Sequence, residues 1–262
     1  MPANRNTTIT AIVLDFETGG LDCQTCAATQ ISLHAIRLDT FEIMKTLNLY
    51  IKPYPYQDFV KPKRKVLKTK WEIEDEENEG EKMMTYTKAA MEVSGITKEM
   101  LINQGKDLRF VCEQIIDFCI ENRLSTGVSN KPILVGQNVT FDIGFMQQIM
   151  TYTGLYERFC KAVDSYKDYF GNLQPRYYDT LYLAKLVFAN DKGVTSYKLE
   201  TIALLLGIEM DDAHDADADV TATEEVFRVF TKRLRIANSS DTTDTGIVNN
   251  IKREKLRDHF KI

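Results

Sequence analysis

Four carboxylate side chains stand at the ends of apolar segments that lie far apart in the sequence. Asp15 and Glu17 close the apolar run Thr10–Leu14, and residues two apart in a strand point to the same side. Asp142 follows a second apolar run and lies in the first turn of a predicted helix, and Asp219 lies in the first turns of the last predicted helix. Buried acids are costly unless positive charge lies between them. This pattern therefore predicts a cation site.

The predicted site has the composition of a two-metal centre. Two unit negative charges ~4 Å apart repel by about 4 kcal/mol at an effective dielectric of ~20, and divalent cations with oxygen ligands, such as Mg²⁺ or Mn²⁺, remove that repulsion. Two such ions about 3.5–4 Å apart bind the attacking and leaving oxygens of a phosphodiester. His214 lies five residues before Asp219, on the loop entering the helix. There an imidazole can take the proton of the attacking water, so we expect phosphodiester hydrolysis with two divalent cations.

The segments that carry these residues read as strands followed by helices. Ile31, Leu33 and Ala35 alternate with more polar residues in the run 30–36, and the run 46–51 repeats this period. Together with residues 10–14 these runs predict an antiparallel meander, and residues 132–136 predict a further buried strand. Strands first and helices around them favour a three-layer α/β fold.

Apolar residues at helical spacing predict five helices. They are expected over 107–123, from near 142, from 177, directly after Ser196 and over 215–234. Ser196 is a plausible N-cap for the fourth of these helices and Gly207 its stop, since these residue types favour the two helix ends.

Composition excludes several classes of protein. The 262 residues (30.1 kDa) are 44% hydrophobic and 27% charged, values of a globular chain rather than a disordered or fibrous one. There is no apolar stretch of about 18 residues, and the first residues lack the features of a signal peptide. Five cysteines without framework spacing favour a reduced protein. We therefore expect a cytoplasmic protein with no membrane partner.

Three motifs together resemble the DEDDh family of 3′–5′ exonucleases. Residues Asp15–Thr18 match D-x-E-T, residues Asn138–Asp142 match N-x-x-F-D, and residues His214–Asp219 match H-x-x-x-x-D. The three motifs occur in the family's order and on the expected elements. Within the family the sequence is most similar to the epsilon (proofreading) subunits of bacterial DNA polymerase III, over about residues 9–52 and 86–234.

The resemblance implies a three-layer RNase H-like exonuclease fold, with a mixed central β-sheet flanked by helices. It implies a 3′–5′ exonuclease that acts on DNA 3′ ends and proofreads for a DNA polymerase, with single-stranded DNA or frayed 3′ ends as substrate and a polymerase subunit as partner. The residues implied to be catalytic are Asp15, Glu17, Asp142, Asp219 and His214, of which the four acids would hold Mg²⁺ or Mn²⁺. The residues implied to bind substrate are Phe16, Thr18, Leu21, Asn138 and Phe141.

Other interpretations fit some of the same residues. The motifs leave the sugar open, so RNA trimming of the RNase T or oligoribonuclease kind is the alternative activity, and a catalytically silent nucleic-acid-binding module is a third possibility. Core packing explains Phe141 as well as base stacking does, and a turn explains Asn138 as well as substrate contact does. For Asp215 and Asp217 a solvated helix N-terminus is favoured over metal binding.

We expect one exonuclease domain over residues 1–235, followed by a polar linker and a short segment at 236–262 that could dock on a partner. A charged insertion occupies about 55–85. A helical enlargement at about 156–176 has aromatic residues among lysines; these would form either a packed helical hairpin or a stacking groove for single strands.

The net charge of −5 does not argue against a nucleic-acid partner. A basic block and an acidic block inside the insertion nearly cancel, and the four proposed ligands account for most of the surplus. Cys23 and Cys26 are expected to be two reduced thiols in a loop; a metal role, with His34 as a further ligand, is the less favoured interpretation.

Overall fold

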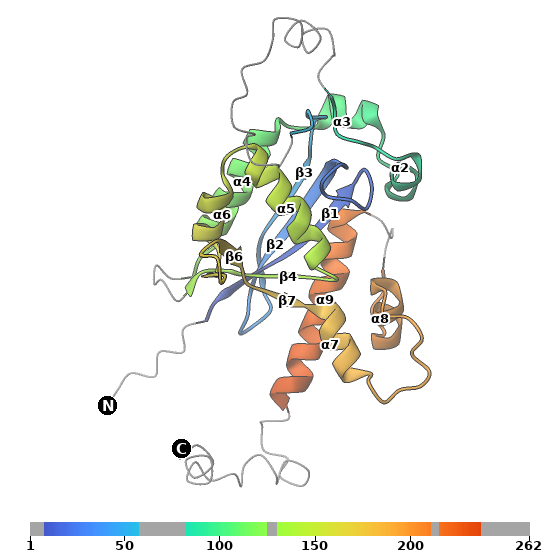
Figure 1. The fold of residues 1–262 in the computed structure, drawn as a ribbon. Helices are drawn as coiled ribbons and strands as arrows, with labels where there is room; N and C mark the ends of the chain where they lie inside the picture. The colour runs from blue at the N-terminus through green and yellow to red at the C-terminus, as the bar shows by residue number, and fades with distance from the viewer. Residues whose placement is uncertain (1–7, 58–81, 125–129, 211–214, 237–262) are drawn as a thin grey trace, which may run out of the picture.

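A five-stranded mixed sheet forms the centre of the protein (Figure 1). The structure is a computed structural model that describes residues 8–57, 82–124, 130–210 and 215–236. The strand order is β3-β2-β1-β4-β7. The strands are β1 (Thr10–Thr18), β2 (Ala28–Arg37), β3 (Ile43–Tyr50), β4 (Ile133–Gly136) and β7 (Tyr177–Asp179).

The expected antiparallel meander is confirmed. Strand β1 pairs with β2, and β2 with β3, in antiparallel register. Strand β4 runs parallel to β1, and β7 runs parallel to β4. Because parallel strands end at the same edge of a sheet, the residues that follow β1, β4 and β7 come together there.

Helices cover both faces of the sheet, which gives the three layers that the sequence predicts (Figure 1). Ile12 and Leu14 of β1 pack with residues of α4, α5 and α6 on one face. Ala11 and Val13 pack with α9 on the other face, and α7 and α8 pack beside α9. The helices are α2 (Lys88–Ser94), α3 (Lys98–Gln104), α4 (Leu108–Glu121), α5 (Thr140–Tyr152), α6 (Tyr156–Ala162), α7 (Thr180–Val187), α8 (Leu199–Leu206) and α9 (Ala216–Ile236).

Two helix starts differ from the prediction. Residues 177–179 form strand β7, because Tyr177 and Tyr178 pair with β4 at the sheet edge. The helix begins at Thr180 after its N-cap Asp179. Helix α8 begins at Leu199, and the Ser196 hydroxyl accepts the Lys198 N–H at 3.3 Å in the turn before it. The predicted stop is confirmed, since Gly207 takes a left-handed φ of 71°.

Only the first third of the enlargement at 156–176 is helical. After α6 the chain forms a two-stranded antiparallel hairpin, β5 (Ser165–Lys167) with β6 (Leu173–Pro175). The Asp168 carboxylate accepts the N–H groups of Phe170 and Asn172, both at 2.9 Å, and so shapes the turn. A side chain that satisfies backbone donors in this way favours a turn over a continued helix.

Several predicted segments lie outside the described residues. They include most of the charged insertion and the whole stretch 237–262. The two ends of the insertion meet, because the Tyr56 N–H donates to the Lys82 carbonyl at 2.7 Å. Among the described helices, none has the length and apolar character needed to span a membrane.

Candidate active site

Asp15 and Glu17 project from the face of β1 that α9 covers. Side chains alternate along a strand, and Ala11 and Val13, which precede the two acids at the same spacing, pack against α9. Both acids are half-buried. Strand alternation therefore delivers two carboxylates to one side of the sheet, as the sequence predicts.

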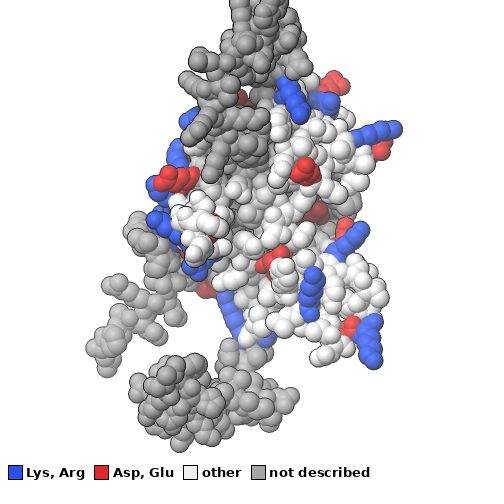
Figure 2. Space-filling model, viewed as in Figure 1, with Lys and Arg blue, Asp and Glu red and all other residues white. Residues whose placement is uncertain are grey.

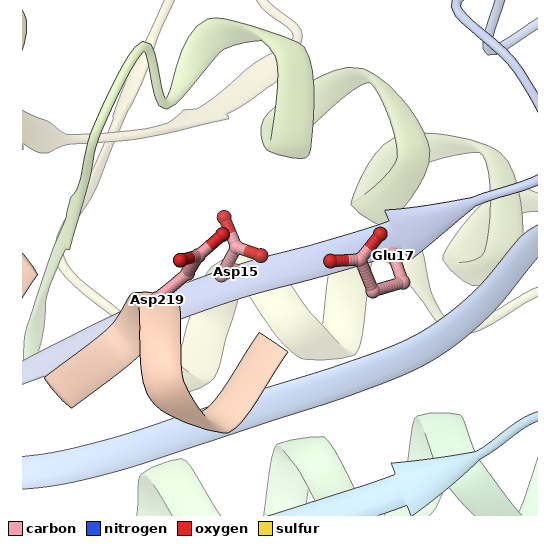
Figure 3. Close-up of side chains that lie close together, drawn as sticks. All are labelled: Asp15, Glu17 and Asp219. Carbon is pink, nitrogen blue, oxygen red and sulfur yellow. The ribbon is translucent and has the colours of Figure 1, made fainter. Parts of the chain in front are cut away.

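Asp219 reaches the same place from the start of α9. Figure 3 shows its carboxylate beside that of Asp15, with Glu17 farther along β1. One carboxylate oxygen from each of the three residues lies within 4.8 Å of the others. Such spacing suits oxygen ligands that share a divalent cation.

Asp142 approaches β1 from the other helical layer. It lies in the first turn of α5, is 2% exposed, and its Oδ1 accepts the backbone N–H of Phe16 at 3.0 Å. Phe16 stands between Asp15 and Glu17 in the chain. The hydrogen bond therefore fixes the fourth predicted carboxylate to the same short stretch of β1.

Burial and neighbouring negative charges raise the pKa values of Asp15, Glu17 and Asp142. Burial is the largest cause for Asp15, whose pKa lies well above its usual value, and the charges of Asp142, Asp219 and Glu17 add to it. Burial, followed by the charges of Asp219 and Asp215, raises the pKa of Glu17 to about 8. Burial also raises the pKa of Asp142 to about 8, although the Phe16 N–H opposes this. The ionised forms of these three carboxylates are therefore disfavoured in the folded protein.

The residues expected to bind substrate lie in different environments. Leu21 is 88% exposed on the loop after β1, and Asn138 is exposed with a left-handed φ of 55°. Thr18 is buried, and its hydroxyl donates to the Gly20 carbonyl at 2.8 Å. Phe141 is half-buried, with its ring centroid 5.0 Å from that of Phe145. Leu21 and Asn138 are accessible to a substrate, whereas Thr18 shapes the loop.

Phe16 departs from its expected role. Its side chain is 4% exposed and packs with the core on the face of β1 opposite the carboxylates. The alternation that brings Asp15 and Glu17 together necessarily turns the residue between them away. We therefore place no base contact on its ring; its backbone N–H serves the site by holding Asp142.

The loop that carries Leu21 is fixed by backbone pairing at both ends. The Gly19 N–H donates to the Ala27 carbonyl at 2.7 Å, and the Thr87 N–H donates to the Gly19 carbonyl. A Cβ on Gly19 would lie 2.6 Å from the Thr85 carbonyl oxygen, so the close approach requires glycine. The Gln148 amide donates to the carbonyls of Cys23 and Cys26 at 2.5 and 2.8 Å.

His214 lies outside the described residues, so its role as general base stays a prediction. The residue after it, Asp215, is not merely a solvated helix start. Asp215 Oδ1 accepts the Asp217 N–H at 3.0 Å and the Gln30 amide at 3.2 Å. Asp217 likewise faces β2, where it accepts a hydrogen bond from Ser32 at 2.8 Å.

Two buried polar residues near the site, His34 and Asp179, make contacts that the sequence does not predict. Both ring nitrogens of buried His34 face carboxylates of α9, those of Asp217 and Glu224, so the ring is not turned to the cysteine pair. Burial lowers the pKa of His34, but these two hydrogen-bonded carboxylates outweigh it and raise the pKa above its ordinary value. Asp179 is 7% exposed; its Oδ1 accepts the Asn138 N–H at 3.0 Å and so shapes the turn before α5. The sequence holds one signal for these contacts. Asp217 and Glu224 are seven residues apart and therefore lie on one face of the helix.

The charge of the molecular surface is mixed. On the face drawn in Figure 2, Lys and Arg side chains lie mostly near the outline, and acidic side chains lie between them. The described residues on this face do not form one continuous basic patch. Attraction of a nucleic acid to this face would therefore depend on local contacts more than on long-range charge.

Comparisons with known proteins agree with the fold and identify the family. A family model for exonucleases, RNase_T, matches residues 79–227. The PolC-type DNA polymerase III of Thermotoga petrophila is 26% identical over 244 residues, and that of Thermotoga maritima is 25% identical over 249 residues. These alignments cover 90% and 95% of this chain, which spans 13% of the length of each of these relatives.

Solved structures share the fold. E. coli Exonuclease I in complex with a dT13 oligonucleotide superposes with a TM-score of 0.60 at 18% identity, over 88% of this chain and 43% of that chain. Exonuclease I from Methylocaldum szegediense gives a TM-score of 0.58 at 21% identity, over 87% of this chain and 41% of that chain. The expected RNase H-like exonuclease fold is confirmed. Because the family model covers more than half of the residues, the chain belongs to the RNase_T family of exonucleases.

Proposed function

We propose that this protein is a metal-dependent 3′–5′ exonuclease that removes nucleotides from DNA 3′ ends. The observation that carries the proposal is the convergence of Asp15, Glu17 and Asp219 within 4.8 Å, with Asp142 fixed to the Phe16 N–H. The polymerase and Exonuclease I relatives support DNA as the substrate and proofreading as the context.

The residues fit a pair of divalent cations. All four side chains offer hard oxygen ligands, and the raised pKa values of Asp15, Glu17 and Asp142 indicate charge that a cation would neutralise. Asp15, Glu17, Asp142 and Asp219 would hold Mg²⁺ or Mn²⁺. When bound, such a pair supplies positive charge to the phosphodiester and to the attacking water.

The chain's own groups would do the remaining work. His214 would take the proton of the water as its oxygen bonds to phosphorus, while the bond from phosphorus to the 3′-oxygen of the preceding nucleotide breaks. The leaving 3′-oxygen takes a proton from solvent water, so the products are a 5′-mononucleotide and a strand with a new 3′-hydroxyl. Leu21 and Asn138, both exposed beside the site, would contact the terminal nucleotide.

Digestion of matched DNA and RNA single strands labelled at the 5′ end tests the proposal. We expect DNA to shorten from its 3′ end with Mg²⁺ and to stay intact in excess EDTA. His214→Ala should slow digestion by about 10²–10⁴-fold, the usual contribution of a positioned acid or base. Faster digestion of RNA would replace the proposal by an exoribonuclease, and intact strands of both kinds would indicate a silent binding module.

The β5–β6 hairpin offers a second contact for the strand. Tyr169 and Phe170 at its tip are 97% and 83% exposed, and their ring centroids lie 5.4 Å apart. Phe159 of α6, by contrast, is fully buried. The core-packing interpretation thus suits α6, and the stacking interpretation suits the β5–β6 hairpin.

Replacing both tip residues by alanine is expected to raise the KM for a long single strand about tenfold, because stacking contributes roughly 1–3 kcal/mol per base. A strand of three nucleotides, which presents few bases beyond those at the carboxylates, should be digested as by wild type. Tyr182→Ala removes an aromatic side chain that is 63% exposed on α7 and serves as the control. Equal KM values for the long strand in all three proteins would exclude the hairpin contact.

A further inference from the structure

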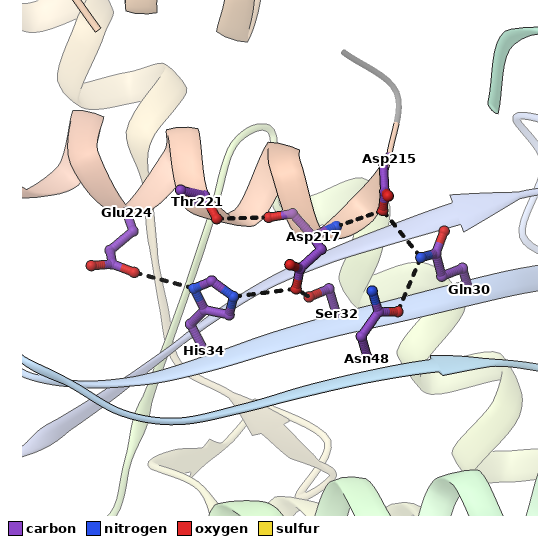
Figure 4. Close-up of polar contacts among 8 residues, drawn as sticks. All are labelled: Gln30, Ser32, His34, Asn48, Asp215, Asp217, Thr221 and Glu224. Carbon is purple, nitrogen blue, oxygen red and sulfur yellow. Dashed lines mark hydrogen bonds and ion pairs between the residues drawn. The ribbon is translucent and has the colours of Figure 1, made fainter. Parts of the chain in front are cut away.

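Six polar residues join β2 to the first turns of α9 (Figure 4). We refer to them as the β2–α9 ladder: Gln30, Ser32 and His34 on β2, and Asp215, Asp217 and Glu224 on or beside α9. The β2 residues alternate in sequence, so all three side chains leave the same face of the sheet. All three are buried.

The ladder lies directly beside the carboxylate cluster. In the register of β1 with β2, Ser32 stands opposite Asp15 and Gln30 stands opposite Glu17. Directly opposed residues on neighbouring strands have adjacent side chains. The contacts that hold α9 to β2 are therefore one strand away from the two acids that meet Asp219.

His34 makes the contacts that extend farthest along α9. Its Nδ1 lies 3.2 Å from Glu224 Oε2, and its Nε2 lies 3.3 Å from Asp217 Oδ1. The His34 and Glu224 side chains are each only 5% exposed. Removing one member of such a buried pair leaves the other without its partner, which is costly.

These contacts control the rotation of α9 about its own axis. Two residues along an α-helix turn a side chain by about 200°, so Asp217 and Asp219 leave α9 on opposite flanks. The buried Val220 and Phe227 lie between these flanks and pack on the sheet. Apolar packing alone tolerates some rotation, whereas hydrogen bonds of Asp217 and Glu224 to one imidazole do not. Any rotation that breaks them also moves Asp219.

We propose that His34 is a positioning residue that, through Asp217 and Glu224, fixes the rotation of α9 that aims Asp219 at Asp15 and Glu17. This inference rests on the proposed function, because it assigns His34 to the geometry of the same carboxylate site. His34 itself touches neither substrate nor cation.

Binding of Mn²⁺, measured by the electron paramagnetic resonance signal of the free ion, tests the proposal without using activity. We expect His34→Leu, which keeps the volume but removes both hydrogen bonds, to weaken Mn²⁺ binding about 10–100-fold, the usual cost of losing a group that orients a ligand. Ile115→Val trims a fully buried side chain of α4 on the other face of the sheet and should leave Mn²⁺ affinity unchanged. A folded His34→Leu protein with wild-type Mn²⁺ affinity would overturn the proposal.

A second pair of variants decides the question if His34→Leu does not fold. Glu224→Gln keeps an oxygen that accepts from the imidazole and should retain Mn²⁺ affinity, whereas Glu224→Ala should lose it. Equal Mn²⁺ affinities for these two variants would refute a positioning role. Asp15→Asn distinguishes a failure of the proposed metal site from a failure of the role of His34. If the Asp15→Asn protein binds Mn²⁺ as well as wild type does, the proposed metal site is wrong, and His34 then has no site to position.

Discussion

Replacing Asp15 by asparagine should lower the exonuclease rate by more than about 100-fold, which is the upper range for losing a group that only orients a metal ligand. Asparagine keeps the size of the side chain and one oxygen, but it removes the negative charge that a divalent cation requires. The same change should raise the melting temperature of the cation-free protein. The reason is that burial and the charges of Asp142, Asp219 and Glu17 disfavour an ionised Asp15. A lower exonuclease rate together with a higher melting temperature would show that the Asp15 carboxylate serves the reaction while its ionised form destabilises the folded protein.

The control for Asp15→Asn is a carboxylate with the opposite electrostatic environment. Hydrogen bonds from Arg37 and Thr8 hold the pKa of Asp39 well below its usual value, and this residue lies on the turn after β2. Asp39→Asn should therefore leave the rate unchanged and should not raise the melting temperature. Steady-state digestion in Mg²⁺ and thermal unfolding in EDTA provide the two measurements. An Asp15→Asn protein that digests DNA at the wild-type rate would remove Asp15 from the site.

The placement of Asp15 and Glu17 was predictable because a local rule determines it. Strand alternation puts Asp15 and Glu17 on one side of the sheet, and the same rule turns Phe16 into the core. The match of residues 15–18 to the D-x-E-T motif suggested instead that Phe16 contacts the substrate. Strand β7 was not predictable in the same way. Its three residues are too few to show a period, and the pairing with β4 that makes them a strand joins segments about 40 residues apart.

The contacts of the β2–α9 ladder could not be predicted from the sequence. His34 and Glu224 are 190 residues apart, and neither belongs to a motif. Their pairing depends on the way α9 crosses β1 and β2, which is a property of packing between layers. A histidine within a strand and a glutamate within a helix are individually ordinary; only their burial against each other gives them a role.

Raising the pH should destabilise the cation-free protein. The pKa values of Glu17 and Asp142 are raised from 4.5 and 3.8 to about 8. Between about pH 4 and pH 8 the folded state therefore keeps protons that the unfolded state has lost, so the free energy of unfolding falls as pH rises. At about 1.4 kcal/mol per pKa unit, the loss is on the order of 5–10 kcal/mol, with the share of half-buried Glu17 reduced by solvent screening. This corresponds to a decrease in melting temperature of at least roughly 10 °C.

Mn²⁺ or Mg²⁺ should reverse this dependence, because a cation binds the ionised carboxylates and stabilises the folded state that holds it. Thermal unfolding from pH 5 to pH 9, in EDTA and in saturating Mn²⁺, measures both effects. Asp142→Asn isolates one carboxylate from all other titrating groups: its melting temperature in EDTA should match that of wild type near pH 5 and exceed it at pH 9. Curves that run parallel across this range would show that Asp142 titrates normally in the folded protein. In that case Asp142 of α5 would carry no unfavourable charge for a cation to neutralise.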